Sequence, residues 1–289
     1  MNIGFIGFGE VGQEMSKGFY ANDSSHKVFV YDTLYEKTET KKRAKEAHAV
    51  LFANPLKVVQ EELDILFVAV PAQYSKDAWK SVWSDLNDTT IYVDLSTASS
   101  ETKQQISKEM KCENRLFVDG AIMGPLKVNQ QKVPMMVSGI GSKEFIEWGK
   151  AFDMNLVYVS ELAGDATNIK FIRSIFTKGL STLLHEVMEI AEKLELDETI
   201  LNSITDTIDK EPFENVINRL ITGNVFHSER RVKEMENVIS FMLENDIEPQ
   251  MTRATRDKLI TITNTNIKEK FHGKAPLHWK HVMQTINQT

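Results

Sequence analysis

The hydrophobic and polar positions follow different periods in the two halves of the chain. In the first half, short apolar runs rich in β-branched and aromatic residues alternate with segments of helical period, which is typical of a parallel sheet covered by helices. The run at residues 65–70 is apolar throughout, as expected where both faces of a sheet are buried. We expect strands at residues 2–6, 27–31, 65–70, 90–94, 116–119, 133–138 and 156–159, and helices that begin near Glu10, Tyr35, Tyr74 and Ser100.

The second half lacks clear strand patterns. Residues 165–196 contain no proline and a single glycine, Gly179, and therefore predict a helix of ~45 Å at 1.5 Å per residue. The chain is thus predicted to hold an α/β Rossmann domain with a doubly wound, mostly parallel sheet over residues 1–162, and an all-helical substrate and dimerisation domain over residues 163–289. Breaks in the helical pattern are expected near Pro212, Asn224, Pro249 and Gly273.

Composition narrows the functional classes. The 289 residues are 42% hydrophobic and 26% charged, which is ordinary for a globular protein and excludes a disordered chain. Lys and Arg number 34 against 41 Asp and Glu, for a net charge of −7, so no basic footprint for nucleic acid or an anionic membrane stands out. The longest apolar stretch, residues 65–71, is far shorter than the ~20 residues of a membrane span. We therefore expect a cytoplasmic protein with a small-molecule partner.

A glycine-rich segment follows the first predicted strand. Residues 7–12 read Gly-Phe-Gly-Glu-Val-Gly and open a helical pattern, so Gly7 permits the tight turn, Gly9 lets the backbone approach a pyrophosphate, and Gly12 allows close helix packing. Asp32 ends the next strand, 20 residues after Gly12, where a carboxylate binds the adenosine ribose. We predict an NAD site formed by Gly7, Phe8, Gly9, Glu10, Val11, Gly12 and Asp32, with NADP as a possible substitute.

A second candidate contact ends the strand at residues 65–70. Val70 and Pro71 stand at its carboxyl end, the edge of an open α/β sheet at which ligands bind. The alternative is that Pro71 simply terminates the strand, because proline has no N–H to donate to a sheet. We assign both residues to the cofactor site.

Four motifs carry a family resemblance: Gly-Phe-Ile-Gly-Phe-Gly at residues 4–9, Asp-Leu-Ser-Thr at 94–97, Val-Asp-Gly-Ala-Ile-Met-Gly-Pro at 118–125, and Gly-Asp-Ala-Thr-Asn-Ile-Lys at 164–170. Their order and spacing resemble the β-hydroxyacid dehydrogenase family, which includes 3-hydroxyisobutyrate and 6-phosphogluconate dehydrogenases and is related to imine reductases. The second half, with its motifs at residues 173–180, 230–236 and 248–255, looks like the subgroup with a phosphogluconate-dehydrogenase-like C-terminal domain.

The resemblance implies roles for particular residues. It places Ser96 beside the substrate and Thr97 beside the nicotinamide, and it makes Lys170 the catalytic lysine. It also implies that Ile122, Met123 and Gly124 form a substrate-binding turn. Three positions depart from the family pattern: Pro125 stands where a second glycine is usual, Met123 where a serine is usual, and Ser174 where an asparagine is usual.

The long helix supports the lysine independently of the resemblance. At ~100° per residue, Lys170 shares one stripe with Ser174, Thr177 and Ser181, flanked by Arg173 and Lys178, while apolar residues fill the opposite side. A polar stripe of this kind borders either a cleft or plain solvent. We take Lys170 and Ser174 as catalytic, and Arg173, Thr177 and Lys178, together with Ser96 and the turn at residues 122–124, as substrate-binding.

A lysine can take a hydroxyl proton if burial or a neighbouring cation lowers its pKa toward neutrality. Arg173 and Lys178 would either supply that repulsion or attract an anionic group of the substrate, and both interpretations stay open. The histidines show no ligand spacing with Asp or Glu, so no metal site is expected.

The sequence predicts an NAD(P)-dependent oxidoreductase that moves a hydride between a nicotinamide cofactor and a small anionic β-hydroxy acid, with Lys170 as general acid and base. We expect a homodimer, because its elongated helices carry more apolar surface than one short domain covers. One alternative is reduction of an imine, although related imine reductases often carry another residue at the lysine position. The other is a cofactor-binding protein without turnover.

Overall fold

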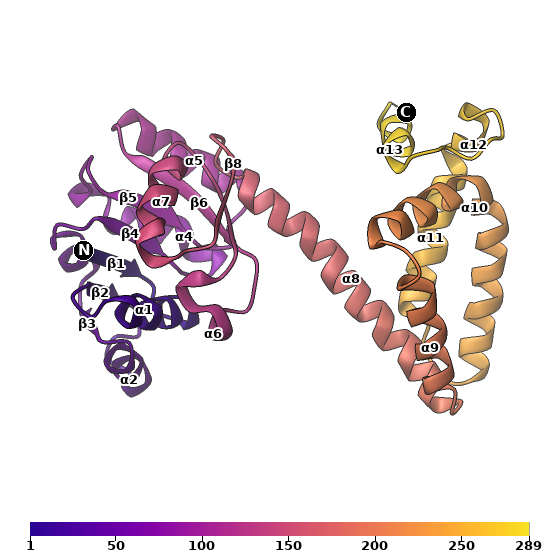
Figure 1. Cartoon of the computed structure of the whole chain (residues 1–289), viewed down its shortest axis with the longest axis horizontal. Helices are drawn as coiled ribbons and strands as arrows, with labels where there is room; N and C mark the ends of the chain where they lie inside the picture. Colours follow the sequence, from indigo (N-terminus) through magenta and orange to yellow (C-terminus); the bar gives the residue numbers. More distant parts are fainter. Residues whose placement is uncertain (289) are drawn as a thin grey trace. The chain divides into compact units, whose positions relative to one another are not determined.

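The computed structural model describes residues 1–288, and the chain divides into two compact units. The first runs from Met1 to Ile175, and the second begins at Phe176. The boundary lies within α8 (Asp165–Lys193), which is drawn as one continuous helix in Figure 1. The boundary predicted from the sequence, between residues 162 and 163, instead precedes this helix.

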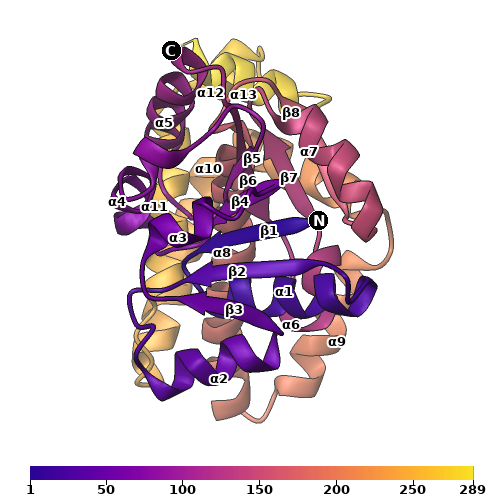
Figure 2. The ribbon, with the colours of Figure 1, turned by 90° about the vertical axis from the view of Figure 1, so that its left-hand side faces the viewer.

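The first unit is built on a single sheet (Figure 2). In the part of the chain that the structure describes, this sheet has eight strands in the order β3-β2-β1-β4-β5-β6-β7-β8. Neighbouring strands are parallel except β6 and β7. This confirms the predicted Rossmann-type, mostly parallel sheet. The strands are β1 (Asn2–Ile6), β2 (Lys27–Tyr31), β3 (Ala49–Phe52), β4 (Ile65–Val68), β5 (Ile91–Asp94), β6 (Leu116–Ile122), β7 (Met135–Ser138) and β8 (Leu156–Ser160).

Some strand boundaries differ from the prediction because they depend on pairing with other strands or on where the chain leaves the sheet. β4 ends at Val68 rather than at residue 70, because the chain turns away from the sheet ahead of Pro71, which has no N–H for a ladder. β6 extends to Ile122 because this residue pairs with Met135 of the antiparallel β7. β3 was not predicted. It is a short strand at the edge of the sheet and alternates poorly between buried and exposed positions.

Helices cover the sheet in the first unit. The predicted starts at Glu10 and Ser100 are confirmed, and the Ser99 hydroxyl caps the second of these helices by accepting from the N–H of Thr102. The helix predicted to begin near Tyr35 begins three residues later, at Thr38, because residues 33–37 form turns and a bend. The helices are α1 (Glu10–Asn22), α2 (Thr38–Glu46), α3 (Pro55–Val59), α4 (Ser75–Lys80), α5 (Ser100–Cys112), α6 (Leu126–Asn129) and α7 (Ser142–Gly149).

The core of the first unit lies on both faces of the sheet. Along β4, Ile65 and Phe67 belong to one apolar cluster and Leu66 and Val68 to another. Alternate residues of a strand point to opposite faces, so both faces are packed. The uninterrupted apolar run of this strand follows from that double burial.

The second unit is helical. Pro212 and Pro249 precede the first residues of α10 and α11, as expected for a residue that cannot continue a preceding helix. The break predicted near Asn224 is wrong, since α10 passes through it and buries Val225 next to it. Packing of a helix face thus overrides the weak helix propensity of asparagine. Besides the end of α8, the helices are α9 (Asp197–Ile208), α10 (Phe213–Glu244), α11 (Gln250–Asn264), α12 (Ile267–Lys270) and α13 (Trp279–Asn287).

Candidate active site

A cleft of about 380 Å³ opens in the first unit at the carboxyl ends of the central strands. It lies where the strand order reverses between β1 and β4, the point at which ligands bind in open α/β sheets. Its walls come from the loop after β1, the ends of β4 and β5, the segment after β6, and α8. The lining residues are Gly9, Glu10, Val11, Ala69, Val70, Pro71, Leu95, Ser96, Thr97, Ile122, Gly124, Leu126 and Lys170.

The glycine-rich loop leads directly from β1 into α1. Gly7 has φ of +89°, and a Cβ there would lie 2.4 Å from the carbonyl oxygen of Ala69, so no other residue fits without a shift of the backbone. A Cβ on Gly12 would lie 2.8 Å from the Phe8 ring. Both glycines therefore allow close packing: Gly7 lets the loop approach the segment that follows β4, and Gly12 lets α1 approach the loop.

The geometry of this loop fits an NAD pyrophosphate. Gly9 lines the cleft, and a Cβ added to it would meet no atom within 4 Å and would occupy the cleft itself. Gly9 is also the N-cap of α1 and supplies no side-chain hydrogen bond to the first N–H groups of the helix. Such N–H groups and the positive end of the helix dipole bind phosphate. Gly9, Glu10 and Val11 would therefore hold the diphosphate.

Asp32 follows β2 and is tied to the same loop. Its carboxylate accepts hydrogen bonds from the N–H of Phe8 at 2.8 Å and from the N–H of Leu34 at 2.8 Å. A carboxylate offers about four lone-pair positions, so these two bonds orient it and leave capacity for hydroxyl groups. The structure therefore fixes the Asp32 carboxylate beside the glycine-rich loop, and its role in binding a ribose stays a prediction.

The segment after β5 brings Ser96 and Thr97 to the cleft. The N–H of Ser96 donates to Oδ1 of Asp94 at 2.8 Å, and the Ser96 hydroxyl accepts from the N–H of Ala98 at 3.3 Å. Burial would raise the pKa of the Asp94 carboxyl, but the Lys103 ammonium and the hydrogen bond from Ser96 more than offset this and lower it. Asp94 is therefore a fixed anion that shapes the turn.

The predicted substrate turn follows β6. Ile122 and Gly124 line the cleft, whereas the backbone of Met123 is bonded elsewhere. Its N–H donates to the carbonyl of Pro134 at 2.8 Å, and its carbonyl accepts from the guanidinium of Arg173 at 2.7 Å. Arg173 therefore joins α8 to this turn and places a positive charge beside it.

Lys170 is half-buried and lines the cleft together with the glycine-rich loop. It lies near the start of α8, whose first turn is bound by Asp119 of β6. The Asp119 carboxylate accepts from the N–H groups of Gly164 at 3.1 Å and Thr167 at 3.0 Å, and from the Thr167 hydroxyl at 2.8 Å. These bonds satisfy N–H groups at the helix start and hold Lys170 at the cleft.

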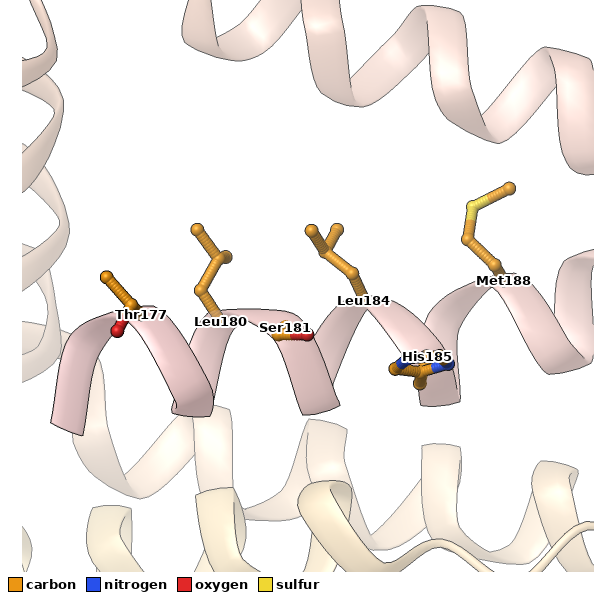
Figure 3. Close-up of a pocket in the computed structure, with 6 residues that line it drawn as sticks. All are labelled: Thr177, Leu180, Ser181, Leu184, His185 and Met188. Atoms are coloured by element: carbon orange, nitrogen blue, oxygen red, sulfur yellow. The ribbon is translucent and has the colours of Figure 1, made fainter. Parts of the chain in front are cut away.

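The remaining predicted site residues lie outside this lining. Within the first unit these are Gly7, Phe8, Gly12, Asp32, Met123, Arg173 and Ser174. Thr177 and Lys178 belong to the second unit. Thr177 lines a separate hollow of about 520 Å³ in the second unit. Figure 3 labels its lining residues, which all lie on α8: Thr177, Leu180, Ser181, Leu184, His185 and Met188.

Sequence reasoning missed two groups of residues. Ala69, Leu95 and Leu126 line the cleft, although Ala69 lies within the predicted strand at residues 65–70, Leu95 within the motif at 94–97, and Leu126 directly after the motif at 118–125. The second group is the buried set of Asp94, Lys103 and Asp119 behind the cleft. A signal for it exists, because Lys103 shares the buried face of α5 with Ile106 and Met110, where a lysine is unusual.

Among residues 1–288, no three His, Cys, Asp or Glu side chains gather in a way that could hold a metal ion. In the same part of the chain, no helix has both the length and the apolar character needed to cross a bilayer.

Comparison with known proteins identifies families for both halves. Residues 2–152 match the family described as the NAD binding domain of 6-phosphogluconate dehydrogenase. Residues 191–261 match a domain of unknown function, DUF1932. A protein of Methanothermus fervidus, named the uncharacterized 28.5 kDa protein in the 7S RNA 5′ region, is 31% identical over 258 residues, which cover 89% of this chain and 97% of that protein.

Solved structures agree on the fold. The conserved protein MTH1747 of unknown function, described as structurally similar to 3-hydroxyacid dehydrogenases, is 27% identical with a TM-score of 0.59 and covers 95% of this chain and 100% of its own. An imine reductase from Myxococcus stipitatus in complex with NADP⁺ has a TM-score of 0.72 over 91% of this chain and 94% of its own, but at 14% identity it shows the fold alone. The predicted resemblance is confirmed: the chain has an NAD-binding, hydroxyacid-dehydrogenase-like fold and belongs to the family defined by the NAD-binding domain of 6-phosphogluconate dehydrogenase.

Proposed function

We propose that this protein is an NAD(P)-dependent oxidoreductase that acts on a small anionic β-hydroxy acid, with Lys170 as its general acid and base. The observation that carries the proposal is that Lys170 lines the same cleft as Gly9 and Ser96. An amine that lines the cleft proposed to bind the cofactor would be able to exchange a proton with a substrate bound there.

The cofactor would lie along the carboxyl edge of the sheet. Asp32 would bind the adenosine ribose, and the N–H groups at the start of α1 would hold the diphosphate. Val70 and Thr97 line the cleft beyond this loop and would border the nicotinamide. The chemistry supplied by a bound nicotinamide would be that of hydride acceptor for the carbinol carbon in oxidation and hydride donor in reduction.

The proton follows a separate route. In oxidation, Nζ of Lys170 would accept the proton of the substrate hydroxyl as the C–O bond becomes a carbonyl, and in reduction the ammonium would return it. The Ser96 hydroxyl already accepts from the N–H of Ala98, so its own proton is directed elsewhere and can be donated to the same substrate oxygen. Ser96 would thus orient the reacting oxygen toward Lys170.

The substrate anion would lie near the turn after β6. Arg173 stands beside that turn through its bond to the carbonyl of Met123, and a guanidinium has five N–H donors. Pro125 follows Gly124 and contributes no N–H, so recognition of a carboxylate or phosphate by backbone N–H groups is reduced there. A side-chain cation would compensate for this loss.

The test is a screen of small hydroxy acids with NAD⁺ and NADP⁺, followed at the absorbance of the reduced nicotinamide, with Lys170→Met compared on any substrate found. Methionine keeps the aliphatic stem and helix propensity, so NADH affinity should stay nearly constant. We expect kcat to fall by roughly 10²- to 10⁴-fold. Ser174→Ala should have a smaller effect, a loss of about 1 kcal/mol, because it removes a single hydroxyl hydrogen bond.

Lys150→Met, which removes an exposed lysine of the same unit, is the matched control and should behave like the unaltered protein. If Lys170→Met keeps more than about half of the activity, Lys170 is a solvated helix residue and the proposed chemistry fails. If the protein turns over cyclic imines but no hydroxy acid, its activity is C=N reduction and the proposed hydroxy-acid reaction is wrong. If the protein binds NADH but turns over neither hydroxy acids nor imines, it is a cofactor-binding protein without turnover.

A further inference from the structure

Behind the cleft, α5 carries a lysine whose side chain is completely buried. Nζ of Lys103 donates to the carbonyl of Asp94 at 2.8 Å and to its carboxylate Oδ1 at 2.8 Å, and it lies 3.2 Å from Oδ1 of Asp119. Two of the three donors of the ammonium therefore serve Asp94, and Asp119 lies within ion-pair distance of the same charge. Lys103 is not among the residues that line the cleft and touches no reacting atom in the proposed chemistry.

Packing alone does not account for this lysine. Burying an ammonium carries a large desolvation penalty, and a cation in the first turn of a helix opposes the helix dipole. Ile106 and Met110 fill the same buried face of α5 with apolar side chains, and an apolar residue at position 103 would avoid both costs. What distinguishes Lys103 is therefore the pair of carboxylates that it joins.

Those carboxylates stand directly side by side. Asp94 and Asp119 are register partners on the parallel strands β5 and β6, and both side chains are fully buried. Adjacent strands are only about 4.8 Å apart, and two like charges at that spacing in a buried site repel each other strongly. The Lys103 ammonium provides their shared counter-charge.

Each carboxylate also organises one wall of the cleft. Asp94 accepts from the N–H of Ser96, which sets the turn that carries Ser96 and Thr97. Asp119 accepts from the first N–H groups of α8 and from the Thr167 hydroxyl, one turn before Lys170. The ammonium therefore links the turn after β5 to the helix that carries the lysine.

We propose that Lys103 is a positioning residue, whose ammonium holds Asp94 and Asp119 together and thereby fixes the Ser96–Thr97 turn against the start of α8. Without the ammonium, repulsion between the two carboxylates would separate these walls of the cleft. The catalytic part of this inference rests on the proposed function, because Lys170 and Ser96 share a reacting oxygen only in that chemistry.

Three variants test the inference. Lys103→Met keeps the stem and removes the charge. The double variant Lys103→Met with Asp119→Asn removes one carboxylate as well. Only Asp94 then stays charged, so the net charge of positions 94, 103 and 119 is still −1. The amide introduced by Asp119→Asn can still accept from α8 through its oxygen while its NH₂ donates toward Asp94. Lys108→Met removes an exposed lysine of the same helix and is the control.

The first readout needs no substrate. Hydrogen exchange followed by mass spectrometry reports the N–H groups of Ser96, Gly164 and Thr167, which donate to the two carboxylates. We expect Lys103→Met to lose protection at residues 94–97 and 163–168 and the double variant to regain it. Lys108→Met should match the unaltered protein in both segments.

The second readout is turnover per NADH-binding site, which corrects for any unfolded fraction. Misplacing catalytic groups by about 1 Å costs on the order of 10²-fold, so we expect kcat of Lys103→Met to fall by about 10- to 100-fold while NADH affinity changes little. The double variant should recover much of this loss. The effects of the two substitutions would then not add, whereas a simple packing defect at position 103 would not be relieved by Asp119→Asn.

Unchanged protection in both segments for Lys103→Met, or a double variant no better than the single one, would overturn the positioning role. Should Lys103→Met fail to fold while the double variant folds, repulsion between the two carboxylates is confirmed, whereas misfolding of both overturns it. If the unaltered protein turns over no hydroxy acid, the proposed function fails, and the exchange measurement still decides the role of Lys103.

Discussion

Glu186 of α8 offers a quantitative test of how the helical unit is held together. Its carboxylate accepts from the N–H of Met251 at 2.6 Å and from the N–H and hydroxyl of Thr252 at 2.8 and 2.6 Å. It thereby caps the start of α11 from another helix, where a negative charge also meets the positive end of the dipole.

Glu186→Gln keeps the shape and removes the charge. One amide NH₂ must replace a carboxylate oxygen, so at least one N–H of α11 loses its acceptor, at a cost of about 1–3 kcal/mol. Loss of the charge at the helix end adds up to ~2 kcal/mol in a partly buried site. We expect the free energy of unfolding to fall by about 3 kcal/mol near neutral pH.

The effect should depend on pH with a definite sign. Burial would raise the pKa of Glu186, but hydrogen bonds from the Thr252 hydroxyl and from the N–H groups of α11 outweigh it and lower the pKa below its ordinary value of 4.5. A lowered folded-state pKa gives stability that is fully present above the unfolded pKa and is lost as the pH falls through the folded one. The difference between the unaltered protein and Glu186→Gln should therefore shrink below pH 4.5.

The assay is urea unfolding followed by far-ultraviolet circular dichroism, near pH 7 and below pH 4. Because the two units can unfold separately, hydrogen exchange at the N–H groups of Met251 and Thr252 should accompany it. Glu189→Gln, an exposed glutamate of the same helix, is the control and should change stability by less than about 0.5 kcal/mol. A Glu186→Gln variant as stable as this control, or a difference that grows as the pH falls, would show that the Glu186 carboxylate does not stabilise the start of α11.

Three further outcomes are expected. NADH should bind more tightly than NADPH in a fluorescence titration, because the Asp32 carboxylate repels a 2′-phosphate, and the opposite order would contradict this role. No carbon dioxide should be released from 6-phosphogluconate, since Thr177 stands where the family resemblance places an acidic glutamate, and measurable release would disprove it. Light scattering should give a dimer, because α8 exposes Ile172 and Ile175 by 67% and 76% and such surface favours association; the mass of one chain at micromolar concentration would exclude it.

Elements with a strong hydrophobic period could be predicted from the amino-acid sequence. The strands at residues 2–6 and 27–31 have the predicted bounds, and the long helix begins at Asp165 as predicted. The strand, glycine loop and helix around residues 7–12 also follow from local sequence, because turn, capping and packing requirements act within a few residues of each other.

Tertiary structure decided the elements with weak local patterns. β3 is a strand because β2 pairs with it at the edge of the sheet, and α10 continues through Asn224 because one helix face is buried. In both cases the stabilising contact comes from a segment outside the local window, which no periodicity records.

The site shows the same division. Motifs identify Ser96, Ile122 and Lys170 one by one, but only the pairing of β5 with β6 and the bonds from Asp119 to the start of α8 bring them to one cleft. Lys103 is the clearest case, since its carboxylate partners become neighbours through the register of β5 and β6. Charges that are far apart in an extended chain interact strongly only when folding buries them together, because their interaction energy depends on distance and on the exclusion of water.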